Sequence, residues 1–595
     1  MASDDVTSQK TNLYHRIRGI GTVRDQITAH GKKIIAGYPI SILFLFAIVP
    51  AGILLVTSFF PKPSGEYYSV GFTVRHYGRI VDGQALGYIS TTLFLAVATT
   101  ILCLVIGFPM AYALSRVCSV RYQRVFLVVV IASMWLTVII RTYAIQVLYS
   151  AEGAFNRLFI GLGLISEPIL STTGLFTVLT GMVYGFLPFA LLSMYSSINR
   201  IESSLEEASL NLGANRVQTI WRVILPQSLR GIVVASGIVF ILSSGSYVVP
   251  RLLGDPNHWT LPVLITQQIS DQLNVPYAAA LSLTFVLIID GLLVLSYFLY
   301  KGINAITLSN TGVESLGKEF MRSGNTVLGM IPDPAADRLP LMLRVYLVLA
   351  FALFVLPLLV VITVSFSPGS SMRFPPEGFS LQWYEVAASS ASWTNAMVDS
   401  LFVAVLAALI STSIGASLAY SIDRFDLRYK SQLTALGVLP LVIPPVIVGV
   451  AYMSYFLQIG IWGSRFGVAL AHGVVFSPFA FVLVKKGLDE LDGHLEEAAS
   501  SLGATQIQRV RTITIPLLSS ALFSGALFAF VLSLNEYIIA YFISGFGFNT
   551  VPVEIFASLR YNYSPVIAAI SVFYIALTTV VVVVVDRRFS LSIWD

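Results

Sequence analysis

A polar stretch occurs twice in the chain, as EASLNLGANRVQTIWRVILP (207–226) and as EAASSLGATQIQRVRTITIP (497–516). The two copies place a glutamate, an alanine, a glycine and a closing proline at the same spacing, and they lie 290 residues apart. Each copy separates two long apolar segments. Repeats at a fixed offset indicate an internally duplicated fold. A polar loop present in both copies also predicts a docking surface for a partner with two matching sites.

The composition is that of a membrane protein. The 595 residues are 56% hydrophobic and 11% charged, with a mean hydropathy of +0.80, whereas soluble proteins carry about 25% charged residues. Runs of about 20 apolar residues recur, each long enough to cross a hydrocarbon core of roughly 30 Å. Backbone amides in lipid must bond internally, so these runs predict helices, and the alternation typical of a membrane β-barrel is absent. We therefore expect an all-α polytopic membrane protein.

The apolar runs form two sets of six. About twelve spans are predicted, near 37–60, 89–115, 125–149, 172–197, 229–250, 276–300, 341–366, 398–421, 432–458, 467–486, 517–543 and 565–586. Six crossings return a chain to its starting side, so both halves should insert in the same orientation, as a parallel repeat. The expected division of the chain is an N-terminal arm (1–36), a first half (37–300), a linker (301–340), a second half (341–588) and a C-terminal tail (589–595).

The repeat extends beyond the polar loops. Residues of the early spans match at an offset of 308, and these are Phe94, Gly107, Tyr112 and Arg116 with Phe402, Gly415, Tyr420 and Arg424. Later residues match at 290, and these are Pro188 and Tyr247 with Pro478 and Tyr537. The change of offset predicts extra residues in the first half, in an outer loop near 150–171.

The net charge of +5 follows the positive-inside pattern and needs no nucleic acid to explain it. Basic residues gather beside the ends of the predicted spans: Arg16, Arg18, Arg24, Lys32 and Lys33 before the first, Arg116, Arg121 and Arg124 after the second, and Arg587 and Arg588 after the last. We expect a multi-pass protein of a bacterial inner membrane with both termini in the cytoplasm.

Each polar loop is expected to form two short helices. Ser203 stands three residues before Glu206, a spacing that favours a capping box at a helix start. Gly213 and Gly503 can leave a helix with positive φ. Pro226 and Pro516 suit the first turn of the next span.

These loops resemble the EAA loop of binding-protein-dependent ABC importer permeases. The resemblance covers nearly the whole chain, and each half is similar to one permease subunit of the type I importer architecture. Ser209, Val223 and Ile515 are conservative departures from the motif. In that family the loop seats in a cleft of the ATP-binding subunit. The resemblance implies that coupling to the ATPase involves Glu206, Glu207, Ala208, Gly213, Pro226, Glu496, Glu497, Ala498, Ala499, Gly503 and Pro516.

The sequence contains no G-x-x-x-x-G-K-[ST] phosphate loop and no recognisable catalytic set. The two cysteines, Cys103 and Cys118, and the six histidines show no metal-ligand spacing. We expect a non-enzymatic permease that binds no cofactor or metal itself. ATP and Mg²⁺ are expected on two copies of a separate ABC ATPase, and an external solute-binding protein is expected to deliver the cargo.

Charged residues within spans are costly and commonly face a partner or a cavity. Arg141 and Asp290 fit either a structural ion pair inside the bundle or the lining of a substrate path. Glu536 and Tyr537 favour the path, because Tyr247 occupies the equivalent place in the first half. The candidate path residues are Arg141, Tyr143, Tyr247, Asp290, Asn535, Glu536 and Tyr537.

The same residues suggest a subfamily. Arg141-Thr142-Tyr143-Ala144 resembles a stretch in the first permease of spermidine/putrescine importers, and Ser533-Leu534-Asn535-Glu536-Tyr537 resembles one in the second. That group includes opine and aminoethylphosphonate importers, so a polyamine, opine or aminophosphonate substrate is expected. Ferric-iron and thiamine importers also have fused permeases, and they remain alternatives. A twelve-helix secondary transporter is the alternative from another class.

Overall fold

The computed structural model describes residues 35–63, 68–134, 136–151, 153–167, 172–308, 338–370, 374–492, 494–545, 547–561 and 564–589. Throughout these residues the chain forms helices and loops and no strand. Most of the predicted N-terminal arm, linker and C-terminal tail lies outside the described residues.

The first half contains six membrane-crossing positions. The first is the helix Ile35–Thr57, which ends in α2 (Val49–Thr57) and is followed by α3 (Arg75–Val81). The others, with the short helices between them, are α4 (Gln84–Arg116), α5 (Val120–Met134) with α6 (Val138–Tyr149), α8 (Leu175–Asn199), α11 (Leu225–Ser244) with α12 (Val248–Leu253) and α13 (Leu261–Ser270), and α14 (Val275–Leu308).

The second half repeats this order. Its helices are α17 (Leu339–Val364), α18 (Gln382–Ser389), α19 (Ala391–Arg424), α20 (Lys430–Val442) with α21 (Pro445–Ile459), α22 (Arg465–Glu490), α26 (Ser519–Asn535) with α27 (Ile538–Ser544) and α28 (Val551–Tyr561), and α29 (Val566–Phe589). Eight described helices are long and apolar enough to cross a membrane, or up to 11 when bent pairs count as single spans, and α29 occupies the twelfth predicted position. The all-α class and the repeated order of helices in the two halves are confirmed.

Several spans predicted as continuous helices are broken. The predicted span 125–149 bends by 102° between α5 and α6, and 432–458 bends by 96° between α20 and α21. The second break falls at Ile443, which has extended backbone because the following Pro444 disfavours the helical region for its neighbour. The predicted spans 229–250 and 517–543 are also interrupted, before Val248 and before Ile538.

The duplication is visible in individual hydrogen bonds. The backbone N–H of Leu261 donates to the Thr92 hydroxyl (2.8 Å), and the N–H of Val551 donates to the Ser400 hydroxyl (2.7 Å). These pairs stand at the offsets that the sequence comparison predicts, 308 for the threonine and serine and 290 for the donors. The predicted insertion in the first half is also confirmed, because α7 (Ala154–Gly161) occupies the loop between α6 and α8.

The two halves exchange their first helices. The α2 segment packs on α21 of the second half, and α17 packs on α4, α5 and α6 of the first. A hydrogen bond holds each exchanged helix to the opposite half. The Tyr452 hydroxyl donates to the carbonyl of Phe46, and the Tyr346 hydroxyl donates to the carbonyl of Ile106 (2.6 Å). The two halves are therefore interlocked rather than merely adjacent.

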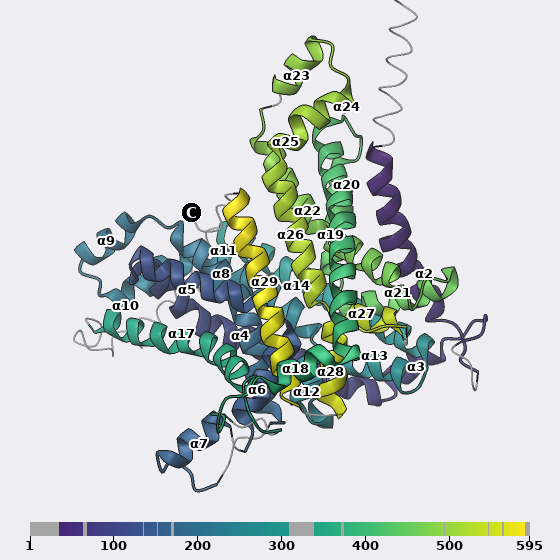
Figure 1. Ribbon diagram of the computed structural model, residues 1–595. Coiled ribbons are helices and arrows are strands. Elements are labelled where there is room, and N and C mark those ends of the chain that lie inside the picture. Colours follow the sequence, from purple (N-terminus) through teal and green to yellow (C-terminus); the bar gives the residue numbers. More distant parts are fainter. Residues whose placement is uncertain are drawn as a thin grey trace, which may run out of the picture.

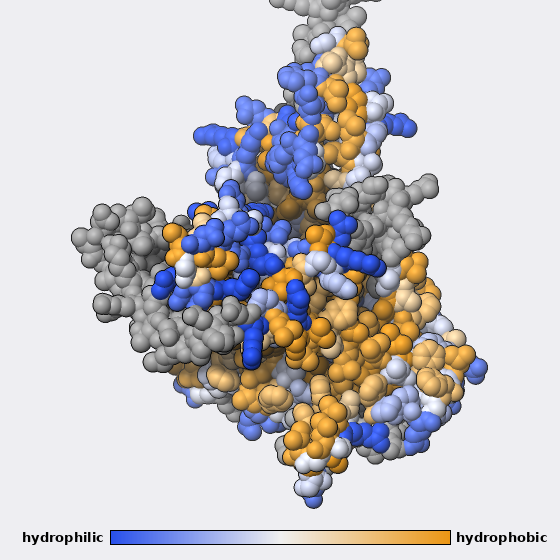
Figure 2. Space-filling view, turned by 90° about the vertical axis from the view of Figure 1, so that its left-hand side faces the viewer, coloured by the Kyte–Doolittle hydropathy of each residue, from blue (hydrophilic) through white to orange (hydrophobic). Residues whose placement is uncertain are grey.

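Figure 1 shows the result of this arrangement. The halves meet around α6, α12, α18 and α28 in the lower part of the view, while α9 (Ser203–Asn211) lies at the left edge and α23 (His494–Ser501) at the top. The two polar loops are therefore carried on the ends of the long helices, away from the region where the halves join. The surface seen in Figure 2 places hydrophilic side chains toward the loop-bearing parts and a broad hydrophobic area below them.

Candidate functional site

The first polar loop folds as a short helix, a turn and a second helical segment. Helix α9 ends near Gly213, whose φ of +87° allows the chain to reverse. Asn215 and Gln218 then form a capping box that starts α10 (Arg216–Thr219). The capping box predicted from Ser203 to Glu206 is wrong, because α9 has Glu202 at its N-cap and no side-chain cap bond there.

The second polar loop has the same construction. Helix α23 is followed by Gly503 with φ of +91°, and Thr505 and Gln508 form the capping box of α24 (Gln506–Arg509). Both loops then pass through a π-helical turn, Ile220–Ile224 in the first and Val510–Thr514 in the second. Pro226 and Pro516 occupy the first turn of the helices that follow, as the sequence predicts.

Glu206 ties the first loop to the membrane helices. The Tyr112 hydroxyl of α4 donates to its carboxylate (2.7 Å), and Arg116 Nε lies 3.4 Å from the other carboxylate oxygen. Arg116 also donates to the carbonyls of Ile198 (3.2 Å) and Ile201, at the C-terminal end of α8. One arginine therefore joins α4, α8 and α9.

Glu496 does the same in the second loop. Arg424 Nε of α19 lies 3.2 Å from its carboxylate, and the Thr514 hydroxyl donates to it (2.6 Å). Arg424 and Glu496 stand at the repeat positions of Arg116 and Glu206. Each polar loop is therefore held to a long helix of its own half by an equivalent arginine–glutamate pair.

The opposite face of each loop is open. We name as the docking surfaces two matched sets of exposed residues: Leu205, Glu207, Ala208, Leu212 and Gly213 in the first half, and Leu495, Glu497, Ala498, Leu502 and Gly503 in the second. Leu212 is 88% exposed and Leu502 is 89% exposed. A single exposed leucine is ordinary, but here exposed apolar side chains recur at equivalent places in both copies.

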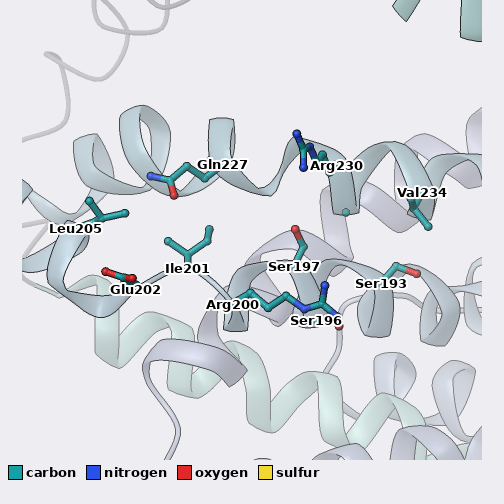
Figure 3. Close-up of a pocket in the computed structure, with 11 residues that line it drawn as sticks. Ser193, Ser196, Ser197, Arg200, Ile201, Glu202, Leu205, Gln227, Arg230 and Val234 are labelled. Carbon is teal, nitrogen blue, oxygen red and sulfur yellow. The ribbon is translucent and has the colours of Figure 1, made fainter. Parts of the chain in front are cut away.

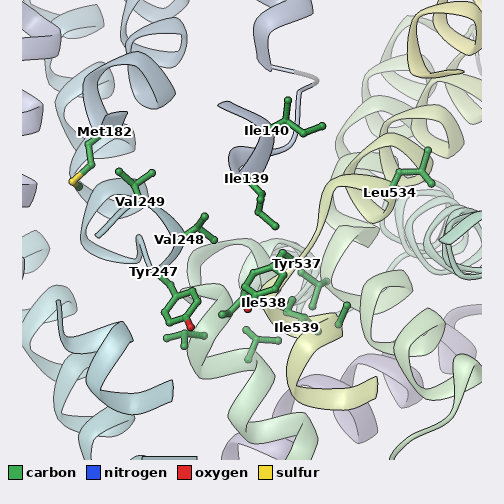
Figure 4. Packing of buried hydrophobic residues seen from close by; sticks show 14 of the residues in the cluster. Ile139, Ile140, Met182, Tyr247, Val248, Val249, Leu534, Tyr537, Ile538 and Ile539 are labelled. Carbon is green, nitrogen blue, oxygen red and sulfur yellow. The ribbon is translucent and has the colours of Figure 1, made fainter. Parts of the chain in front are cut away.

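Tyr247 and Tyr537 meet where the halves join (Figure 4). Their rings are stacked with centroids 6.1 Å apart, and Phe556 packs on both, at 5.8 Å from Tyr247 and 4.6 Å from Tyr537. Each tyrosine begins the short helix after a span, α12 in one half and α27 in the other. The repeat thus brings two predicted path residues into direct contact.

Glu536 lies beside this aromatic cluster and is fully engaged. Its carboxylate accepts hydrogen bonds from the backbone N–H groups of Ile539 (2.9 Å) and Ala540 (3.0 Å), and it lies 3.1 Å from His472 Nε2. The other His472 nitrogen lies 2.8 Å from the Ser533 hydroxyl. A carboxylate on the N-terminal amides of α27 is favoured by the helix dipole. Glu536 therefore orients the turn that carries Tyr537, and Asn535 is the last residue of α26 before that turn.

The remaining predicted path residues are not gathered there as a set. Arg141 of α6 donates to the carbonyl of Gly185 in α8 (2.9 Å). Gly185 lies in the turn before Pro188, where the backbone hydrogen bonding of the helix is weakened because proline has no N–H. Tyr143 is buried in the core, whereas Asp290 is exposed on α14. Within the described part of the chain no ion pair joins Arg141 to Asp290, so that structural alternative is wrong.

The sequence reasoning missed the residues that hold the loops. Tyr112, Arg116 and Arg424 were matched between the halves as repeat markers, but no role followed from the match. The sequence did contain a signal for this role. Both equivalent apolar helices end with a tyrosine followed four residues later by an arginine. The exposed Leu212 and Leu502 were also missed, although each directly precedes the motif glycine.

Residues 68–305 and 411–592 both match the family of binding-protein-dependent transport system inner membrane components. The chain belongs to this family. Since the match occurs twice, the protein is a fused two-half permease with the type I ABC importer fold. It is a multi-pass inner membrane protein.

Curated relatives are each matched by less than half of the chain. The spermidine/putrescine transport system permease protein PotB of Haemophilus influenzae is 29% identical over 273 residues, covering 46% of this chain and 95% of the relative. The putrescine transport system permease protein PotI of Escherichia coli is 32% identical over 234 residues, covering 38% and 83%. A solved bacterial ABC transporter involved in the import of the acidic polysaccharide alginate matches with a TM-score of 0.35 and 20% identity, covering 43% of this chain and 98% of that one.

Proposed function

We propose that this permease couples to two copies of a separate ABC ATPase, one on each docking surface. The observation that carries the proposal is the paired construction of the loops, in which Glu206 and Glu496 face inward to an arginine while Leu212 and Leu502 face outward. A surface tied to a long helix on one side and open on the other is suited to transmit movement of a bound partner. ATP and Mg²⁺ belong to that partner, and the permease performs no chemistry.

The proposed orientation places both docking surfaces in the cytoplasm, with both chain termini on the same side. An external solute-binding protein then docks on the opposite side, over the loops near 61–88, 251–275, 367–397 and 544–564. Closure of the ATPase dimer moves the halves about their interface and opens a path to the outside, and hydrolysis resets the path. The stacked Tyr247 and Tyr537 are suited to close this path in the resting state, because they come from opposite halves.

The proposed cargo is a polyamine-type cation. The similarity to spermidine/putrescine and putrescine transport permeases supports this class over ferric iron and thiamine. Aromatic faces at the interface suit an alkylammonium cargo, since cations bind over aromatic rings with about 0.5–2 kcal/mol. Glu536 acts on the cargo indirectly in this account, because its carboxylate is already engaged by α27 and His472.

The test is uptake by proteoliposomes that contain the full-length permease, its ATPase and an externally added binding protein loaded with radiolabelled spermidine. The account predicts uptake that requires ATP inside the vesicle and continues when ionophores collapse all ion gradients. Uptake that stops with the gradient and proceeds without the ATPase would instead establish a secondary transporter. ATP-driven uptake of a ferric or thiamine cargo but not spermidine would overturn the cargo class alone.

A further inference from the structure

A polar groove lies between α8 and α11 of the first half, beside the polar loop, and shares Leu205 alone with the docking surface (Figure 3). Its volume is about 670 Å³. Helix α8 contributes Ser193, Ser196 and Ser197, with Arg200 at its C-cap, and helix α11 contributes Gln227, Arg230, Gly231 and Val234. Both sets follow the i, i+3, i+4, i+7 spacing of a single helix face. Two membrane helices therefore turn a hydrophilic stripe toward each other.

The charge of the groove is concentrated at two arginines. Arg200 and Arg230 come from opposite helices, and Ser197 lies between them (Figure 3). Both arginines are exposed, and neither forms an ion pair or side-chain hydrogen bond with the residues that the structure describes. Glu202 also lines the groove, but at the end nearer to Leu205. Two guanidinium groups that line one groove from its two sides provide donors suited to an anionic group such as a phosphate.

The groove continues onto an apolar surface. Val234 forms its far end and is 55% exposed, and on the same helix Leu229 is 52% and Val233 is 48% exposed. Exposed apolar residues on a membrane-crossing helix contact acyl chains. A ligand that occupies both the arginine-lined groove and this apolar surface has a phosphate head and a hydrocarbon tail. A free phosphate ion would fill only the groove.

The second half lacks the arginine pair at the equivalent places, and its one basic residue there is Lys486, at the place of Ser196. The repeat puts Leu483 and Glu490 where the first half has Ser193 and Arg200, and it puts Leu517 and Ser520 where the first half has Gln227 and Arg230. Glu490 is already paired with Lys486 (3.7 Å). The duplication therefore shows that a basic groove is not needed for the fold of a half.

We propose that this groove binds the headgroup of an anionic phospholipid, with the phosphate between Arg200 and Arg230 and the acyl chains along α11. Basic pockets between membrane helices commonly bind anionic headgroups. The two arginines outnumber the single Glu202, so the site favours phosphatidylglycerol over the zwitterionic phosphatidylethanolamine. Assignment to the cytoplasmic leaflet rests on the proposed orientation, whereas lipid binding itself does not depend on the ATPase or the cargo.

The experiment is native mass spectrometry of the purified full-length chain, titrated with phosphatidylglycerol, phosphatidylethanolamine or inorganic phosphate. We expect one preferentially retained phosphatidylglycerol, which inorganic phosphate does not displace. The double variant Arg200→Ala/Arg230→Ala should bind it roughly 30-fold more weakly. The matched control Lys430→Ala/Lys486→Ala removes the same charge from the corresponding side of the second half and should retain the lipid.

A second variant guards against misfolding. Arg230→Ser introduces the residue that the folded second half carries at this place, Ser520, and should weaken retention while leaving the elution volume and helical content unchanged. Equal retention by the groove and control variants, equal retention of the two lipids, or displacement by inorganic phosphate would overturn the proposal.

Discussion

At the residue scale, two adjacent glutamates in each polar loop have opposite roles. Neighbouring residues on a helix point in different directions, so Glu206 reaches Tyr112 and Arg116 while Glu207 faces solvent. The motif predicted both as coupling residues, but a charge pattern alone does not show which of two glutamates packs inward. That distinction required the position of Arg116 in space.

The pair offers a matched test. Glu206→Ala should speed amide exchange in residues 203–211 by roughly tenfold, because a hydrogen bond to a charged group contributes about 1.5–3 kcal/mol and is partly screened here. Glu207→Ala should leave exchange in α9 unchanged and weaken only ATPase retention. Hydrogen–deuterium exchange with mass spectrometry measures both. Equal exchange in the two variants would contradict the assignment of Glu206 as the tether.

Glu536 provides a second test at this scale. Glu536→Gln should lower the melting temperature of the purified permease, because the carboxylate accepts two backbone amides of α27 and faces His472. The control is Glu385→Gln, at an exposed position on α18. Thermal unfolding in detergent is the measurement. A variant with an unchanged melting temperature and a raised KM for transport would show that Glu536 binds cargo directly.

At the element scale, each polar loop depends on one glycine that reverses the chain. Gly213 and Gly503 have φ of +87° and +91°, and an added Cβ would meet nothing within 4 Å at either place. Substitution therefore adds backbone strain without a clash. The sequence predicted this feature correctly, because a glycine after a short polar helix is typical of a helix C-terminus.

Gly213→Ala and Gly503→Ala should each destabilise the loop by about 1 kcal/mol. The expected result is a normal yield of inserted permease with reduced stimulation of ATPase activity by the loaded binding protein. Gly237→Ala is the control, since this helical glycine also has open space around it and has no positive φ. Full stimulation in both loop variants would show that the turn geometry does not matter for coupling.

The sequence predicted correctly where the apolar helices lie, but it did not predict which of them are broken. Hydropathy locates apolar runs, but it is an average, whereas a break depends on one residue. Pro444 ends α20 and Glu536 ends α26, and a single residue changes the mean hydropathy of a long run too little to mark a break. The interruptions before Val248 and Ile538 are also the places that carry Tyr247 and Tyr537 to the interface, so the missed breaks form part of the candidate path.

At the scale of the whole molecule, exchange of the first helices makes the two halves mutually dependent. A single sequence shows which segments are repeated but not which half a helix packs on, so this exchange could not be predicted. Hydrogen bonds from Tyr452 to Phe46 and from Tyr346 to Ile106 join the halves directly. The covalent linker should therefore be dispensable for assembly.

Residues 1–320 and 321–595 expressed together as separate chains should co-purify as one complex. The reason is that helix packing within the membrane, rather than the linker, holds the exchanged helices in place. Each fragment expressed alone should be unstable, because it lacks the first helix of the other. Affinity purification through a tag on one fragment measures the association. Two independently stable fragments that do not associate would contradict the exchanged arrangement.

The most direct test of the central claim is the mass of the complex between the full-length permease and its ATPase, measured by native mass spectrometry. The account predicts two ATPase copies on the unaltered chain, one copy when either Leu212→Asp or Leu502→Asp is introduced, and none when both are present. The control Leu164→Asp, at an exposed residue in the insertion between α6 and α8, should retain two. Two bound ATPase copies on the double docking-surface variant would contradict the account.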